Sequence, residues 1–172
     1  MSRRQRALQH EHGFTLMEVM VTILIMGIVV AIASSTWFRL IENRRVEGAT
    51  NQMVSELRRA HSSATNRLEY WQVDPIVNTR NYRVGPCADP CATPLDPSSP
   101  STQNGSLEER TFFKPPGSVT RVVFEPNGDA EIIGSENERI KVAAADGAPC
   151  HEIEINEATS RVRVIRNVCD AV

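Results

Sequence analysis

The feature that most constrains this chain is a run of 20 residues without a charge, from Val19 to Phe38, bounded by Glu18 and Arg39. About 20 apolar residues in a helix span the hydrocarbon core of a bilayer. A short leader containing three arginines precedes the run and is expected to stay cytoplasmic. The run therefore predicts one membrane-spanning helix, with the rest of the chain on the opposite side.

The carboxylate of Glu18 stands at the edge of this apolar run. An acidic side chain on a lipid-facing helix costs about 2–3 kcal/mol, and less near the interface. An acid at such a position usually has a partner. We therefore expect Glu18 to act in an interaction rather than in anchoring.

The stretch Gly13-Phe14-Thr15-Leu16-Met17-Glu18, with its basic leader and apolar helix, resembles the class III signal of type IV pilins and pseudopilins. The resemblance implies that a prepilin peptidase cuts between Gly13 and Phe14 and methylates Phe14. It also implies that Glu18 neutralises the N-terminal amine of a neighbouring subunit during assembly. Ser35 stands where many pilins have a proline, so Gly27 is the one weak point of the run.

Two other interpretations compete with this one. An ordinary secretory signal peptide could be cleaved after Ala31-Ile32-Ala33, but Glu18 would then lie inside its apolar region. A plain single-span anchor leaves both Gly13-Phe14 and Glu18 without a purpose.

Beyond the apolar run, hydrophobic residues recur at spacings of three and four, which predicts that the helix continues with one apolar face. These residues are Val46, Ala49, Met53, Leu57, Ala60, Ala64, Leu68 and Trp71. An unbroken helix from Phe14 to Trp71 would be roughly 87 Å long. We expect a leader at 1–13, a hydrophobic transmembrane and assembly helix at 14–41, an amphipathic stem at 42–72, and a head at 73–172.

The head is predicted to be rich in β-structure. Residues 74–118 are expected to be irregular apart from a short strand at Thr79–Val84, with a loop over 86–118. Five short β-branched segments follow, separated by turn signals: 119–125, 130–134, 138–143, 150–155 and 161–166. The last two alternate apolar and charged residues, so one face is buried, and as a hairpin they would place Glu152 and Glu154 near arginines.

All four cysteines, Cys87, Cys91, Cys150 and Cys169, fall in the predicted head. Because that side of the membrane is oxidising, an even number of cysteines favours disulfides, and their spacing favours Cys87–Cys91 with Cys150–Cys169. A zinc site of four thiolates is the alternative, but the last two cysteines are not clustered. We expect no metal and no cofactor.

The head also resembles the GspH/FimT family of minor pilins and minor pseudopilins, through Phe124-x-Pro126-x-Gly128, a strand led by Cys150, and Arg161-Val162-Arg163-Val164 before a last cysteine. The resemblance implies an α+β fold: a long N-terminal helix packed on a small antiparallel sheet or sandwich.

DNA-uptake members of that family bind DNA through a Gly-Arg-x-Arg motif, which corresponds here to Ser160-Arg161-Val162-Arg163, with Arg80 and Arg83 upstream. Alternate arginines on a strand project from one side, about 6.6 Å apart, and suit phosphates. Arg166 falls on the opposite face unless the strand bulges. The competing interpretation is that these arginines are solvated or paired with Glu152 and Glu154.

Charge and residue spacing exclude several functions. The side chains of residues 14–172 sum to −4, so a DNA contact would need a local patch. The four histidines, His10, His12, His61 and His151, have no nucleophile or ligand partner at useful spacing, so we expect no enzyme.

We therefore predict a minor type IV pilin that helps initiate or cap a pilus, in motility, adhesion or DNA uptake. A minor pseudopilin of type II secretion and a DNA-binding pilin are the alternatives. The expected partners are other pilin subunits, prepilin peptidase, the inner membrane before assembly and, for the last alternative, DNA.

Overall fold

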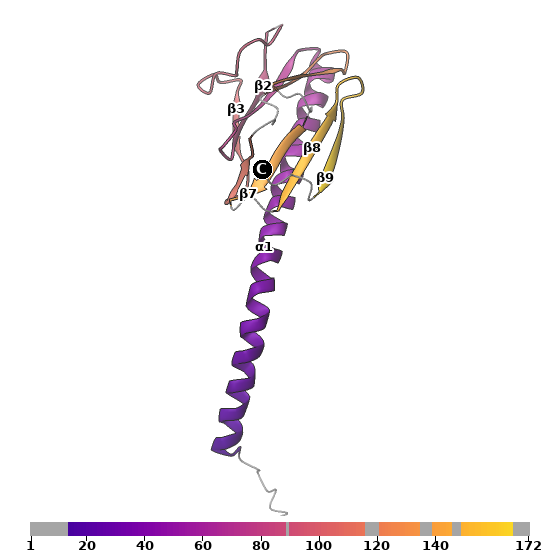
Figure 1. Ribbon diagram of the computed structural model, residues 1–172. Helices are drawn as coiled ribbons and strands as arrows, with labels where there is room; N and C mark the ends of the chain where they lie inside the picture. The colour runs from indigo at the N-terminus through magenta and orange to yellow at the C-terminus, as the bar shows by residue number, and fades with distance from the viewer. Residues whose placement is uncertain (1–13, 89, 116–120, 135–138, 146–148, 167–172) are drawn as a thin grey trace, which may run out of the picture. The chain divides into compact units, whose positions relative to one another are not determined.

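The computed structural model describes residues 14–88, 90–115, 121–134, 139–145 and 149–166. By its internal contacts the chain divides into two units, residues 1–39 and 40–172. One helix, α1 (Leu16–Arg67), begins in the first unit and ends in the second (Figure 1). The strands all lie in the second unit.

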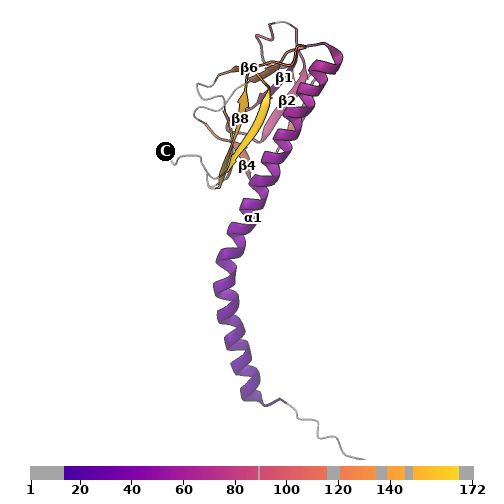
Figure 2. The same ribbon diagram turned by 90° about the vertical axis from the view of Figure 1, so that its right-hand side faces the viewer.

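The second half of α1 forms one side of the hydrophobic core. Its apolar residues at spacings of three and four are fully buried: Val46, Ala49, Met53, Leu57, Ala60 and Ala64. All of them except Val46 belong to one core cluster with residues from both sheets, including Phe124 and Ile153. Figure 2 shows this part of the helix lying along the strands. The predicted amphipathic face is therefore the face on which the head is built.

The helix ends at Arg67, four residues before the predicted face runs out. Leu68 has a φ of 57°, and the Glu69 N–H donates to the Ala64 carbonyl at 3.3 Å. This six-to-one bond behind a left-handed residue is the Schellman arrangement, in which glycine usually takes the position of Leu68. The prediction was wrong for Leu68, which is exposed, and for Trp71, which begins a strand.

The strands form two antiparallel sheets. The five-stranded sheet has the order β3-β2-β1-β5-β6, and the four-stranded sheet the order β4-β7-β8-β9. The first comprises β1 (Trp71–Pro75), β2 (Asn81–Pro86), β3 (Gln103–Ser106), β5 (Arg121–Phe124) and β6 (Ala130–Ile133). The second comprises β4 (Thr111–Phe113), β7 (Arg139–Ala144), β8 (Cys150–Asn156) and β9 (Arg161–Arg166). The α+β fold class is confirmed.

The five strands predicted in the last third are confirmed as β5 to β9, with ends shifted by up to two residues. Residues 74–118 were predicted wrongly, because they contain β3 and β4 as well as β2, and β1 begins just before them. Strands β3 and β4 are short, and the Gln-Asn-Gly-Ser sequence of β3 has no apolar alternation. Their pairing comes from neighbouring strands rather than from local propensity.

Buried polar side chains occupy the face of the five-stranded sheet that points away from the core. Gln72 and Asp74 alternate along β1 with the core residues Trp71 and Val73, and Arg121 projects from β5. Asp74 Oδ1 lies 3.5 Å from the Nε of Arg121 and accepts from Gln72 Nε2 at 2.7 Å. A buried charge is stable only when it is paired in this way.

The segment 91–95, between β2 and β3, crosses this polar face and covers it. Its carbonyls accept in turn from three strands: Cys91 O from Arg121 at 2.9 Å, Thr93 O from Gln72 at 3.1 Å, and Leu95 O from Arg83 at 3.1 Å. The Leu95 N–H donates to Asp74 Oδ2 at 2.7 Å. We call this segment the strap. Sequence analysis predicted a loop here but found no sign of these anchors.

Candidate assembly and binding sites

The N-terminal site is built on the first turn of α1. Thr15 immediately precedes the helix, and its Oγ1 accepts from the Glu18 N–H at 3.2 Å. A threonine cap followed three residues later by glutamate is a capping box, a signal that sequence analysis overlooked. Glu18 and Phe14 line the same shallow hollow with Val19 and Thr22. The local fold thus fixes Glu18 beside the residue expected to become the N-terminus, while Gly13 lies outside the described residues.

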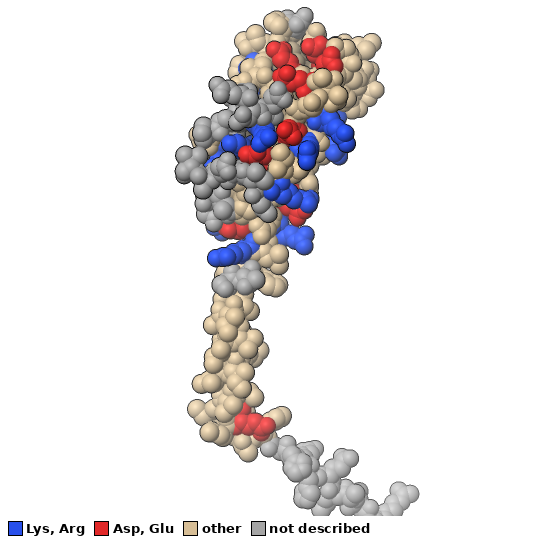
Figure 3. Space-filling view, turned by 45° about the vertical axis from the view of Figure 1, so that its right-hand side comes forward, with Lys and Arg blue, Asp and Glu red and all other residues tan. Residues whose placement is uncertain are grey.

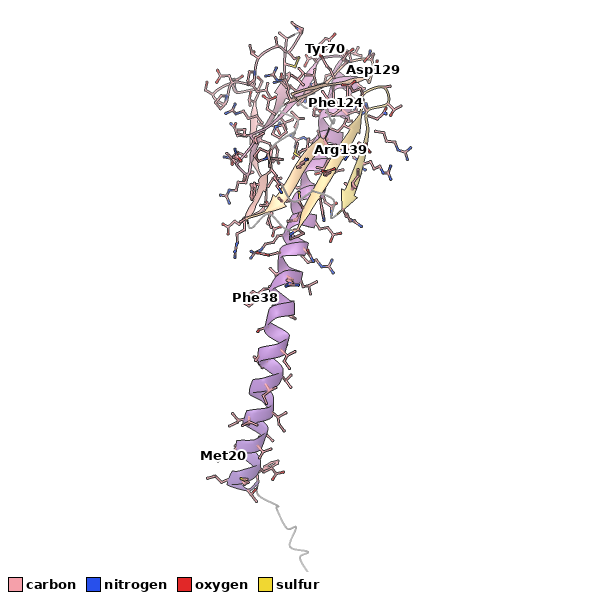
Figure 4. All side chains as sticks on the ribbon, in the orientation of Figure 1. Met20, Phe38, Tyr70, Phe124, Asp129 and Arg139 are labelled. Atoms are coloured by element: carbon pink, nitrogen blue, oxygen red, sulfur yellow. A yellow bond between two sulfur atoms is a disulfide. The ribbon has the colours of Figure 1, made fainter. Side chains whose placement is uncertain are left out.

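The apolar half of α1 buries almost nothing within its own unit. Its large hydrophobic side chains, from Phe14 to Phe38, are exposed by 44–81%. Figure 4 shows Met20 and Phe38 pointing away from the helix. In Figure 3 this part of the helix is tan, with acidic atoms near its start. The helix is long and apolar enough to cross a membrane, with a mean hydropathy of 2.6 over its best 18-residue window.

The second candidate site lies on β9, at an edge of the four-stranded sheet. Arg161 and Arg163 are exposed, whereas Val162 and Val164 pack against the core, as the alternation predicts. Within the described part of the chain, neither guanidinium has an acidic group within 4 Å. A shallow hollow of about 660 Å³ lies beside them, bordered also by Glu154, Asn156 and Thr159.

The glutamates of β8 are paired with the opposite neighbour strand. Arg163 stands directly across from Glu154 in the register. Even so, Glu154 lies 3.5 Å from Arg139 of β7, and Glu152 lies 2.8 Å from Arg139 and 3.8 Å from Lys141. Arg139 is labelled in Figure 4. The interpretation that pairs the β9 arginines with Glu152 and Glu154 is therefore wrong.

The remaining candidate arginines lie elsewhere. Arg166 sits on the core-facing side of β9, as expected for unbroken alternation, and pairs with Glu47 of α1 at 3.3 Å. Arg83 belongs to the other sheet and holds the strap, and Arg80 immediately precedes its strand. The structure therefore brings together Arg161 and Arg163 and leaves the other three out.

The residue before the arginine pair has an unusual backbone. Ser160 has a φ of 48°, in the left-handed region that glycine adopts most easily. Its hydroxyl donates to the Gly128 carbonyl at 2.6 Å. The Gly-Arg-x-Arg motif that this stretch resembles has glycine here; Ser160 adopts a backbone that glycine also adopts and adds a bond to the neighbouring turn.

The cysteines are resolved in part. Cys87 and Cys91 form a disulfide with a Cα–Cα distance of 5.4 Å, at the start of the strap. Cys150 is buried at the start of β8. Cys169 lies outside the described residues, so the Cys150–Cys169 pairing stays a prediction. Among the described residues no group of three His, Cys, Asp or Glu side chains is arranged to hold a metal ion.

The two described histidines both serve the packing of α1. His61 Nε2 lies 3.2 Å from the Gly128 carbonyl, and its ring packs edge-on against Phe124. His151 is buried, with Nδ1 3.3 Å from the Thr50 hydroxyl. Burial lowers the pKa of His151 below its ordinary 6.5 and Arg166 lowers it further, whereas Glu47 acts in the opposite direction.

Comparison with known proteins identifies the N-terminal segment. Residues 8–34 match the family model described as the prokaryotic N-terminal methylation motif. No curated protein and no solved structure matches the chain significantly. The motif supports a type IV pilin-like or pseudopilin protein, and it implies processing by prepilin peptidase and assembly with other pilins. Together with the one helix of the described residues that is long and apolar enough to cross a membrane, the motif supports a membrane-anchored, single-pass protein.

Proposed function

We propose that this protein is a minor type IV pilin, a structural subunit that enters the filament through the apolar half of α1 and helps initiate or cap it. The observation that carries the proposal is the exposed apolar helix of the first unit, headed by Phe14 and Glu18. Such a surface is stable in lipid or against other apolar helices, but not in water. A filament of similar subunits supplies the second environment.

Glu18 would supply the specific contact in that filament. Its carboxylate stands at the first turn of the helix, and cleavage before Phe14 would create a positively charged amine on each neighbouring subunit. An ion pair in an apolar surrounding is much stronger than one in water. The same pair would fix the axial position of one helix against the next.

The test separates this role from helix capping. Glu18→Gln keeps a residue suited to the capping box but removes the charge, whereas Thr15→Ala removes the cap and keeps the charge. We expect both glutamate variants, Glu18→Gln and Glu18→Ala, to reach the membrane but to be absent from sheared filaments. Thr15→Ala should assemble, as should the control Glu56→Ala. Normal incorporation of Glu18→Gln would contradict the proposed contact.

The sister assignment is a minor pseudopilin of a type II secretion system, in which the same helix builds a short periplasmic filament. Deletion of the gene distinguishes the two, since loss of surface pili supports the pilin and loss of secreted enzymes the pseudopilin. Neighbouring genes for minor pilins, or for secretion outer-membrane and ATPase components, give the same distinction.

DNA binding is the second candidate function, and the exposed pair Arg161 and Arg163 is the observation that favours it. Binding through phosphates weakens steeply with salt. The test compares the full mature protein with Arg161→Ala/Arg163→Ala and with the control Arg44→Ala/Arg58→Ala. Selective loss of salt-sensitive binding in the first variant would support a DNA-uptake role.

A further inference from the structure

The strand edges of the head differ in how they are closed. The outer edge of β6 is capped by the turn before β9, because Ala130 and Ile132 donate to the backbone and side chain of Glu157. The edge of β4 is capped by hydrogen bonds with Asn78 and Thr79. Within the described part of the chain, no backbone hydrogen bond reaches the outer edge of β9. Six residues long, β9 is the longest edge strand.

An open edge strand can pair with another strand. Half of the residues in a strand direct their N–H and C=O groups to each side, so β9 presents groups away from β8 that no described backbone group pairs with. Added strands gain their affinity from these groups and their specificity from alternate side chains. The backbone of β9 therefore offers a docking position, and its side chains select the occupant.

Those side chains form the last row of a charge pattern across the outer face of the sheet. Positive, negative and positive rows follow one another on neighbouring strands: Arg139 and Lys141 on β7, Glu152 and Glu154 on β8, and Arg161 and Arg163 on β9. The ion pairs that the described residues form across this face join β7 to β8. The arginines of the third row have no acidic partner in the described part of the chain. A strand added beside β9 would therefore be favoured by acidic side chains on this face.

We propose that β9 is an interaction surface that accepts, by strand addition, an extended segment carrying acidic side chains at alternate positions. A second copy of β9 is a poor occupant, since it would place arginine rows side by side. We therefore assign the segment to a different protein. The inference rests on the proposed function only in taking that protein to be another subunit of the same filament.

The experiment measures binding of synthetic six-residue peptides to the full mature protein in detergent micelles. The probe alternates valine and glutamate, and matched probes have the same composition in block order, lysine in place of glutamate, or N-methyl groups that remove alternate backbone donors. We expect the alternating acidic peptide to bind roughly tenfold more tightly than any other probe. Hydrogen exchange should slow in β9 and not in β3.

Charge reversal provides the matched test in the protein. Arg161→Glu/Arg163→Glu should reverse the preference toward the lysine peptide, whereas Arg44→Glu/Arg58→Glu on exposed helix positions should leave it unchanged. Equal binding of the alternating and block peptides would overturn the proposal. So would a strong preference for single- or double-stranded DNA over the peptide, which would instead assign the arginines to nucleic acid. Neither result bears on whether Glu18 is needed for filament incorporation.

Discussion

The two halves of α1 differ in apolar content and lie in opposite environments. From Leu16 to Phe38 the large hydrophobic side chains are exposed, and from Val46 to Ala64 the apolar face is fully buried. The apolar face of the second half is buried within a single chain, because the sheets cover it, and the polar face is in contact with water. The first half is apolar all round, so its surface can be buried only in lipid or against other helices. One helix therefore combines a folding element with an assembly element.

The sharpest test of this contrast is a pair of identical substitutions, one in each half. Leu57→Ala should lower the free energy of unfolding by about 2–5 kcal/mol, because it leaves a cavity in the core. Leu24→Ala should leave that free energy unchanged. Urea unfolding in micelles, followed by Trp71 fluorescence in a Trp37→Phe background, measures both. A similar loss of unfolding free energy in the two variants would contradict the contrast between the two halves of α1.

The next test concerns the disulfide that begins the strap. In a chain-entropy estimate, a bridge closing so short a loop contributes about 2 kcal/mol, so Cys87→Ser/Cys91→Ser should lose that much. The Leu95 amide, which donates to Asp74, should also exchange its hydrogen faster. Membrane insertion of the apolar half should not change. Undiminished stability with rapid exchange at Leu95 would mean that the bridge orders the strap without stabilising the head.

The end of the packed half provides a smaller test. Leu68 adopts the left-handed conformation that glycine takes without strain, so Leu68→Gly should raise stability by about 0.5–1 kcal/mol. Ser160→Gly is the matched control, because it relieves similar strain but loses the bond to Gly128. We expect its effect to be close to zero. A loss of stability in Leu68→Gly would show that the exposed leucine makes a contact of its own.

The last test uses pH to loosen the contact between α1 and β8. The pKa of His151 is lowered in the folded state, so the unfolded chain takes up a proton first as pH falls below about 6.5. The contribution of the neutral ring is present above that pH and is lost as the solution is acidified. His151→Gln should flatten this part of the stability profile. If stability depends on pH equally steeply in the variant, the loss of stability on acidification comes from other groups.

Sequence reasoning succeeded where one pattern dominates. The uncharged run and the spacing from Val46 to Ala64 predicted α1, and strict alternation placed Arg166 on the face opposite Arg161. It failed at the end of the helix. Leu68 and Trp71 keep the helical spacing of apolar residues, although the helix has already ended at Arg67. Sequence reasoning also did not predict that Glu152 and Glu154 pair with β7. Those pairs depend on β7 lying beside β8, and the order of strands in a sheet cannot be read from either strand alone.

The strap has a consequence for how this protein can change over time. The sheet holds it through main-chain groups, the carbonyls of residues 91, 93 and 95 and the amide of 95. Every chain has these groups whatever its side chains, so substitutions at Thr93 and Pro94 need not weaken the anchorage. The side chains expected to resist substitution are those of the sheet that bind these groups: Gln72, Asp74, Arg83 and Arg121. The outer surface of the strap can therefore vary in sequence while the polar base that holds it stays fixed.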